Sequence, residues 1–209
     1  MIPAAKSESE PVIVEFHYRS HAIIRLNRPT ERNALSIATL KALDAAVTEL
    51  FANASIETII FSGTGTVFAS GANIRELAQL TPATAKEFAA RGQRLFQKIA
   101  DASPLTIAAI NGYCMGGGLD LALACDLRCA SHDAVFAHPG AHLGIITGWG
   151  GTQRLPRLIG KSRALEIFAT TRRVTSKEAY AIGLVNALTD SALECAVRMA
   201  SAAGSMKKA

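Results

Sequence analysis

The sequence predicts a single α/β domain in which strands and helices alternate along the chain. The 209 residues are 49% hydrophobic and 19% charged, which is enough apolar material for one buried core. Short runs rich in β-branched residues alternate with longer segments whose apolar residues recur every three or four positions. No Pro- or Gly-rich linker divides the chain, so repeated ββα-like units are favoured over separate α and β domains.

The first half of the chain supplies a predicted hairpin, two helices and two buried strands. Residues 12–18 and 22–26 are rich in β-branched and apolar residues, and the short break at 19–21 between them is typical of a hairpin. Ser36 precedes apolar residues at helical spacing and is the expected N-cap of the first helix. The elements predicted after it are a strand over 57–61, a helix over 82–100 and a strand over 105–110.

The second half continues the alternation of strands and helices. Residues 176–182 read as a helix, and Gly183 directly after them is a typical C-terminal cap. The other predicted elements are a strand over 126–130, a helix over 161–170, a strand-like piece from Val185, a helix over 191–203 and a frayed basic tail over 204–209.

Composition also bears on where the protein is located and on what kinds of partner it can have. The most apolar segments fall short of the roughly 18 residues of a membrane span, because Asp120 and Asp126 interrupt them. Residues 1–11 carry three charges where a signal peptide needs an apolar run. The four cysteines form no C-x-x-C pair, so neither a disulfide framework nor a metal site is expected. We therefore expect a cytoplasmic protein that does not act at a membrane.

The net charge of +5 requires an explanation. An excess of basic residues can indicate that the protein binds a nucleic acid, a membrane surface or a phosphorylated small molecule. Few aromatic residues lie among the basic ones, so we expect no nucleic-acid partner. A solvated helical face and a phosphate-bearing ligand remain the two interpretations of one basic group, which comprises Arg154, Arg157, Lys161, Arg163, Arg172 and Arg173.

A glycine-rich segment between a predicted strand and an apolar run is the most informative about chemistry. Gly116, Gly117 and Gly118 allow a tight turn there and let a ligand approach N–H groups that have no partner in a first helical turn. Asp120 lies three residues after Gly117, on roughly the same helix face, so an amide donor and a carboxylate can converge on one reacting group. The segment lacks the Gly-Lys-Ser/Thr of a P-loop and the G-x-G-x-x-G of a dinucleotide fold. The chain also has no G-x-S-x-G nucleophile elbow, which leaves close helix packing as the structural alternative.

A second loop of small residues follows another predicted strand. Ser70, Gly71 and Ala72 let a ligand lie against the backbone, and the Ala72 N–H is placed to face the Gly117 N–H. Two such amides form an oxyanion hole, and removing one donor from such a hole typically costs about 2.7–4 kcal/mol of transition-state stabilisation.

Four motifs, in a fixed order between residues 12 and 188, resemble the motifs of a known protein family. They are LNRP at 26–29 with NAL at 33–35, FASGANI at 68–74, NGY at 111–113 with GGG at 116–118, and GGTQRL at 150–155. In this order they resemble the enoyl-CoA hydratase/isomerase family, also called the crotonase family.

The resemblance implies a fold and a substrate. The expected fold is a crotonase-like spiral of ββα units over 12–188, with a short helical remnant and tail over 189–209 and most of the family's C-terminal helices absent. The expected substrate is an acyl-CoA thioester, with no further cofactor, whose carbonyl oxygen lies between the N–H groups of Ala72 and Gly117. Trimers or dimers of trimers and a place in fatty acid metabolism are also implied.

The resemblance further implies which residues line the ligand. Arg28 is expected to meet the CoA phosphates, which would account for the positive charge. Trp149 is expected either to shape the acyl pocket or to be structural. The remaining substrate-binding residues are Ser70, Gly71, Ala72, Asn73, Ile74, Gly116, Gly117 and Gly140.

The acid–base residues depart from the family pattern. Hydratases of the family share proton transfer between two glutamates. Asp120 stands at the first position, and Gly140, in the stretch 136–140, stands at the second. His138 and His142 flank Gly140 and are candidate acid–base groups, since histidine titrates near neutral pH.

The expected activity is addition of water to a trans-2-enoyl-CoA through a thioester enolate, with Asp120 as the surviving acid–base residue. Moving a double bond needs only one carboxylate, so an enoyl-CoA isomerase or another acyl-CoA reaction is an alternative. The glycine at position 140 also motivates a third interpretation, a non-catalytic acyl-CoA-binding protein.

Overall fold

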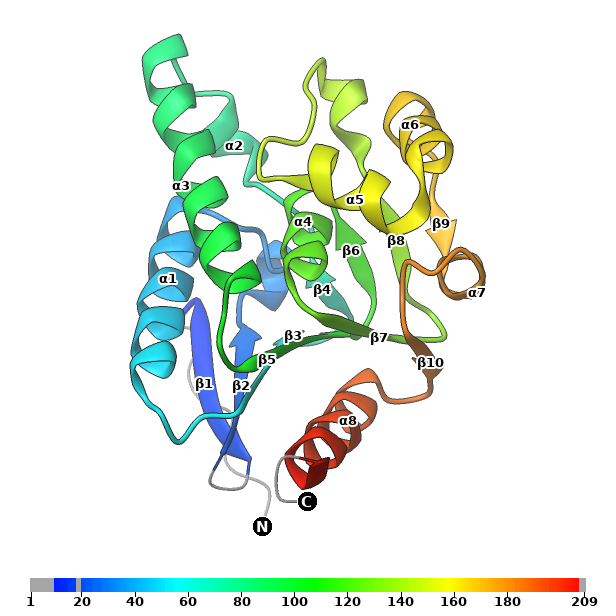
Figure 1. Ribbon diagram of the computed structural model, residues 1–209. Helices are drawn as coiled ribbons and strands as arrows, with labels where there is room; N and C mark the ends of the chain where they lie inside the picture. The colour runs from blue at the N-terminus through cyan, green and yellow to red at the C-terminus, as the bar shows by residue number, and fades with distance from the viewer. Residues whose placement is uncertain (1–9, 18–19, 207–209) are drawn as a thin grey trace.

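The computed structural model describes residues 10–17 and 20–206. They form two sheets surrounded by helices (Figure 1). The larger sheet has six strands in the order β1-β2-β3-β5-β7-β10, of which only the β1–β2 pair is antiparallel. Its strands are β1 (Val12–His17), β2 (His21–Leu26), β3 (Thr58–Gly63), β5 (Leu105–Ile110), β7 (Leu127–Ser131) and β10 (Ala187–Thr189).

The smaller sheet explains how the chain spirals. Three times in succession the chain makes a strand of the larger sheet, then a strand of the smaller sheet, and then helix: β3 and β4, β5 and β6, β7 and β8. The ββα repeat predicted from the sequence is therefore confirmed. The strands of the smaller sheet, in spatial order, are β4 (Val67–Ala69), β6 (Tyr113–Met115), β8 (Val135–Ala137) and β9 (Val174–Thr175).

Several predicted helices have the predicted bounds. Ser36 caps α1 as expected, because its hydroxyl accepts a hydrogen bond from the Thr39 N–H. Helices α3 and α6 and strand β5 match their predictions residue for residue. The helices are α1 (Ile37–Ala52), α2 (Ile74–Leu77), α3 (Pro82–Ala100), α4 (Gly117–Ala124), α5 (Gly151–Ile159), α6 (Lys161–Thr170), α7 (Ser176–Ala181) and α8 (Ala192–Met206), with 3-10 turns η1 (Pro29–Glu31) and η2 (Pro139–Leu143).

Two predicted bounds near the C-terminus are wrong. The last strand starts at Ala187 rather than Val185, because pairing with β7 begins opposite Cys129. The predicted frayed tail begins too early, since α8 continues to Met206. Residues 207–209 of that tail, residues 18–19 of the hairpin and residues 1–9 of the N-terminal segment lie outside the described part of the chain.

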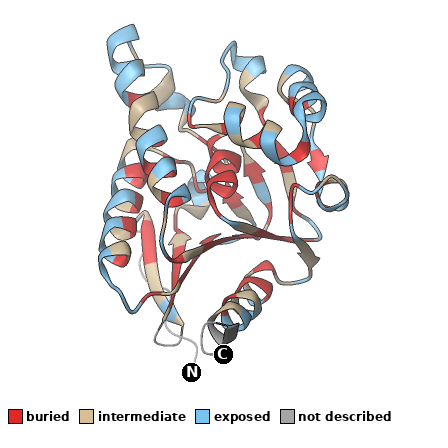
Figure 2. Cartoon of the chain, in the orientation of Figure 1, coloured by how far each residue is buried: buried red, intermediate tan, exposed pale blue. Residues whose placement is uncertain are grey.

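Two apolar cores lie on opposite faces of the larger sheet. The main core fills the space between the sheets and helices α1, α3, α4 and α5. A smaller core of Ile23, Ile60 and Ile107 is covered by Ala196 and its neighbours on α8 (Figure 2). All eight residues of α4 are buried, which is the pattern of a helix at the centre of a domain. Within the described residues, no helix combines the length and the apolar character that a membrane crossing needs.

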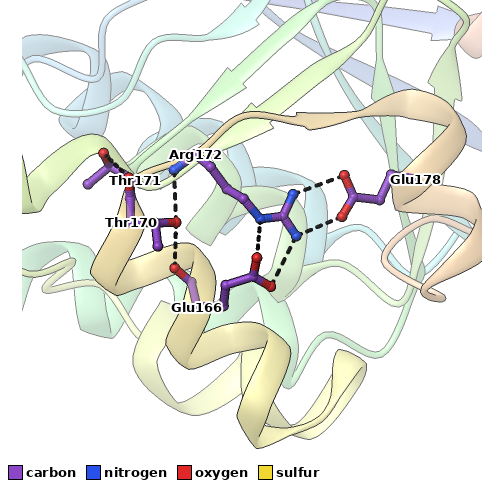
Figure 3. A network of polar contacts seen from close by, with 5 residues as sticks. All are labelled: Glu166, Thr170, Thr171, Arg172 and Glu178. Carbon is purple, nitrogen blue, oxygen red and sulfur yellow. Dashed lines mark hydrogen bonds and ion pairs between the residues drawn. The ribbon is translucent and has the colours of Figure 1, made fainter.

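Part of the basic group identified in the sequence has partners inside the chain. Arg172 forms ion pairs with Glu166 at 2.8 Å and with Glu178 at 2.7 Å, so it ties the end of α6 to α7 (Figure 3). These two carboxylates raise the pKa of the Arg172 guanidinium. Arg154 donates to the Trp149 carbonyl and to the Gln97 side chain. Arg172 therefore needs no phosphate ligand to balance its charge, and the Arg154 guanidinium has hydrogen-bond partners inside the chain.

The Trp149 indole is wedged between two helices that carry glycine where they meet it. It packs against Phe88 and Phe96 of α3, with ring centroids 5.2 Å and 5.6 Å away. A Cβ atom on Gly92 of α3 or on Gly117 of α4 would overlap the indole ring. Close packing of this one ring therefore requires both glycines.

We expect Gly92→Ala to destabilise the protein. Alanine in a helix interior is ordinarily more stable than glycine by about 0.5–1 kcal/mol. Here the added methyl group overlaps a rigid, buried ring, so we expect a net loss of about 1–3 kcal/mol. Urea unfolding measures the change. Gly148→Ala is the matched control, because its Cβ atom would lie at an ordinary 3.9 Å from Ala89. A Gly92→Ala variant as stable as the unaltered chain would contradict this packing.

Candidate active site

A cavity of about 420 Å³ lies beside the smaller sheet. Its wall brings together loop residues predicted from the sequence, Ser70, Gly71, Ala72, Ile74, Gly116, Gly117, His138 and Gly140. The rest of the wall is mainly apolar and includes Leu77, Leu80, Phe88, Leu143, Ile145 and Ile146. Such a lining suits an apolar ligand whose few polar atoms meet the loops.

The smaller sheet brings these distant loops together. Strands β4, β6 and β8 are parallel neighbours, so their carboxyl ends lie at one edge. The loop at 70–72 follows β4, Gly116 follows β6, and His138 follows β8. The Gly116 N–H donates to the Ala137 carbonyl at 2.9 Å, which holds the last two loops side by side.

Glycine allows the first two loops to touch through their backbones. Gly71 has φ +97°, and a Cβ atom there would lie 2.9 Å from the Met115 carbonyl and 3.1 Å from the Gly117 nitrogen. A Cβ atom on Gly117 would lie 3.6 Å from the Ala72 nitrogen. The Ala72 and Gly117 amides therefore lie next to each other on the cavity wall. Within the described residues, neither N–H donates to a backbone carbonyl.

Asp120 is buried behind the wall rather than exposed on it. The carboxyl group is fully buried and accepts a hydrogen bond from the Thr147 hydroxyl. Gly151, the first residue of α5, has no room for a Cβ atom beside Oδ1, so the carboxyl group lies at the start of that helix. Burial raises the pKa of Asp120 to about 7, although hydrogen bonds from Thr147 and the Trp149 backbone and the charge of Arg154 oppose the rise.

His138 lies between Asp120 and the cavity. Its Nε2 atom is 3.6 Å from Asp120 Oδ1, and its ring packs on Phe168 with centroids 4.9 Å apart. Its side chain is 3% exposed, and burial lowers its pKa to about 4. In the part of the chain that the structure describes, the two ring nitrogens of His138 and the Oδ1 atom of Asp120 have no hydrogen-bond partner.

Besides Asp120, three residues predicted to act at the site are not on the cavity wall. His142 is exposed and shares a hydrogen bond with the Thr171 hydroxyl. Asn73 caps α2, where its side chain accepts from the Arg75 and Glu76 N–H groups. Arg28 lies at the start of η1, away from the wall, and its main-chain N–H donates to Asn33.

Gly140 is fitted to a tight loop. Its carbonyl accepts from the Ile145 N–H at 3.0 Å, and a Cβ atom on it would lie 2.8 Å from the Ile145 carbonyl oxygen. Any side chain at this position would have to displace backbone. Sequence reasoning missed Thr147, which binds Asp120, and it missed the apolar wall at 143–146, which appears in the sequence only as a short apolar run.

Comparisons with known proteins agree with this fold. The family model described as enoyl-CoA hydratase/isomerase matches residues 17–208, and the chain belongs to this family. The crotonyl-CoA hydratase of Syntrophomonas wolfei is 42% identical over 166 residues, and the short-chain-enoyl-CoA hydratase of Clostridium acetobutylicum is 37% identical over 166. Each match covers 79% of this chain and 64% of the relative.

Solved structures confirm the crotonase fold. The enoyl-CoA hydratase of Bacillus anthracis has a TM-score of 0.88 and 34% identity, with 91% of this chain and 75% of that chain covered. The DspI protein of Pseudomonas aeruginosa also has a TM-score of 0.88, with 35% identity and 95% and 82% covered.

The opposite pKa shifts of Asp120 and His138 predict opposite effects of pH on stability. The folded state keeps the Asp120 proton up to about pH 7, whereas an unfolded aspartate loses it near 3.9, so this contribution to stability falls as pH rises from 4 to 7. Unfolded histidine binds a proton below about 6.5 and folded His138 only below about 4, so that contribution rises from pH 4 to 6.5.

We therefore expect the two single variants to differ in the sign of their pH dependence. Relative to the unaltered chain, the free energy of unfolding of Asp120→Asn should rise between pH 4 and 7. That of His138→Gln should fall between pH 4 and 6.5. Each change should reach at least about 1.4 kcal/mol, the free energy of one pH unit in a pKa. Urea unfolding across this range measures both, and slopes of the same sign would contradict the two shifts.

Proposed function

We propose that the chain binds an acyl-CoA thioester and performs chemistry of the enoyl-CoA hydratase/isomerase type, with addition of water to a trans-2-enoyl-CoA as the leading reaction. One observation carries the proposal: the adjacent Ala72 and Gly117 amides line an apolar cavity. The 42% identity to a crotonyl-CoA hydratase supports it.

The proposed chemistry depends on the thioester oxygen. In this proposal the oxygen accepts hydrogen bonds from the Ala72 and Gly117 N–H groups, and the acyl chain lies along the apolar wall. When water adds at Cβ, or a proton leaves Cα, negative charge develops on that oxygen. Fixed N–H donors stabilise this charge more than they stabilise the substrate, and this difference lowers the barrier. Gly117 begins α4, so the positive end of the helix dipole also stabilises negative charge on the thioester oxygen.

The acid–base residue decides between the candidate reactions. Asp120 has a pKa of about 7, which suits proton transfer near neutral pH. Gly140 leaves no second carboxylate at its position, and this observation favours double-bond isomerisation, in which one group moves a proton along the chain, as the second candidate. It also favours the third candidate, an acyl-CoA-binding protein without turnover. Arg28 contacts with CoA phosphates, trimeric assembly and a cytoplasmic location stay predictions.

Acetoacetyl-CoA tests the oxyanion site independently of turnover. The enolate of this dicarbonyl thioester absorbs ultraviolet light that the keto form does not, so we expect its absorbance to rise on mixing with the protein. Ala72→Pro removes the N–H and should abolish the rise, whereas Ala72→Gly keeps the N–H and should retain it. Absence of the signal with the unaltered chain would contradict the proposed oxygen site.

Crotonyl-CoA and a 3-enoyl-CoA then separate the three candidate functions. A hydratase lowers the enoyl-thioester absorbance of crotonyl-CoA, an isomerase creates that absorbance from the 3-enoyl-CoA, and a binding protein does neither although acetoacetyl-CoA binds.

Gly140→Glu should not create an efficient hydratase. The glutamate Cβ atom would press on the Ile145 carbonyl, so the loop must move before the carboxylate reaches the substrate. We expect no gain in crotonyl-CoA hydration and a loss of stability of about 1–3 kcal/mol. A large gain in hydration would contradict this view of the loop.

A further inference from the structure

The structure raises the question of which side chain reaches the reacting atoms. Asp120 is fully buried, is not part of the cavity wall, and lies behind Thr147 and Trp149. A group that takes a proton must approach it to about 2.6–3.2 Å, directly or through one water. His138 is on the wall, together with Ala72 and Gly117.

We propose that His138 is the catalytic acid–base residue of this site and that Asp120 is the positioning residue that orients it. The inference rests on the proposed function, because it assumes an acyl-CoA thioester in the cavity. It assigns proton transfer to a histidine in the loop that follows β8, with the aspartate of α4 behind it.

The geometry of the pair carries the proposal. Asp120 Oδ2 is occupied by the Thr147 hydroxyl, whereas Oδ1 faces His138 Nε2 at 3.6 Å. Each of these facing atoms has no other partner among the described residues. The distance is longer than a hydrogen bond, and catalytic contacts of this kind often shorten when substrate binds. Nδ1 of His138 is buried too and has no partner among the described residues, so with Nε2 toward Asp120 it is the ring nitrogen left to take a proton from the ligand.

The fold holds the imidazole in place from several sides. His138 follows β8 directly, and the bond between the Gly116 N–H and the Ala137 carbonyl places it beside the glycine loop. Pro139 disfavours a helical conformation of the residue before it, and His138 has φ −115° and ψ 85°. Phe168 of α6 covers the ring. A preorganised base of this kind needs little rearrangement to react.

The proton step balances without any further reactant. The proton on Cα of the thioester moves to the free nitrogen of His138, and the C–H electron pair becomes the enolate whose oxygen lies between Ala72 and Gly117. The Asp120 carboxylate stabilises the imidazolium that forms. Returning the proton to carbon reverses the step, and returning it to Cγ of an enoyl chain completes an isomerisation.

This step requires both groups to be deprotonated at the start. Burial opposes the carboxylate form of Asp120, whereas the charge of Arg154 on α5 favours it, and the buried Cys114 thiol of β6 interacts electrostatically with Asp120. The pair loses its last proton near pH 7, so the rate of proton removal should rise through that pH.

Deuterium exchange at Cα tests the proposal. Butyryl-CoA is incubated with the protein in D₂O, and mass spectrometry follows deuterium uptake against pH. We expect His138→Gln to lower the exchange rate by about 10²–10⁴-fold. Asp120→Asn should lower it less and move the midpoint of its rise below pH 6.5, because the histidine then titrates alone. Imidazole in the buffer should partly restore exchange to His138→Ala, which a purely structural role would not allow.

The surface pair His132 and Asp190 provides a matched control. It has the same 3.6 Å separation of Nε2 and Oδ1 and lies off the cavity wall, so His132→Gln should keep the unaltered exchange rate. Enolate absorbance of bound acetoacetyl-CoA, which needs no protein base, checks that each variant still folds and binds.

The outcomes separate the two proposals. A His138→Gln variant that exchanges as fast as the unaltered chain overturns the role of His138. An Asp120→Asn variant with an unmoved pH profile overturns the positioning role of Asp120. If the unaltered chain shows neither exchange nor enolate absorbance, the proposed function fails, and this inference fails with it.

Discussion

The backbone contact between the loop after β4 and the start of α4 is the constraint on which the rest of the structure depends. Gly71 approaches the Met115 carbonyl and the Gly117 nitrogen so closely that a side chain at Gly71 would force the two segments apart. Gly118 has the same relation to the Ala69 carbonyl. These contacts seat α4, with Asp120 on it, in the middle of the core.

Burial of Asp120 follows from that placement and costs free energy that its neighbours only partly offset. An isolated carboxylate is expensive to bury, so the group retains its proton up to about pH 7 and accepts the hydroxyl of Thr147. The nearby start of α5 and Arg154 supply compensating positive charge. Strain and polarity of this kind concentrate at functional sites, and here they concentrate on one side of the cavity wall.

Sequence patterns predicted the repeat and the two glycine loops because these depend on local spacing and on backbone freedom. They did not predict which way side chains point. Asp120 follows the glycines at helical spacing, yet it lies behind the wall because Thr147 and Gly151, which come much later in the chain, close over it. His138 and His142 both flank Gly140 in the sequence, and the structure distinguishes them, because His138 is buried beside Asp120 and Phe168 whereas His142 is exposed.

Trp149 has a consequence for observing this molecule. It is the only tryptophan among the 209 residues, and its ring packs against Gly117, Phe88 and Phe96. Indole fluorescence of this chain therefore comes from a single buried position on the cavity wall. Fluorescence excited selectively at the indole therefore reports on the place where a ligand would arrive, with no contribution from a second tryptophan.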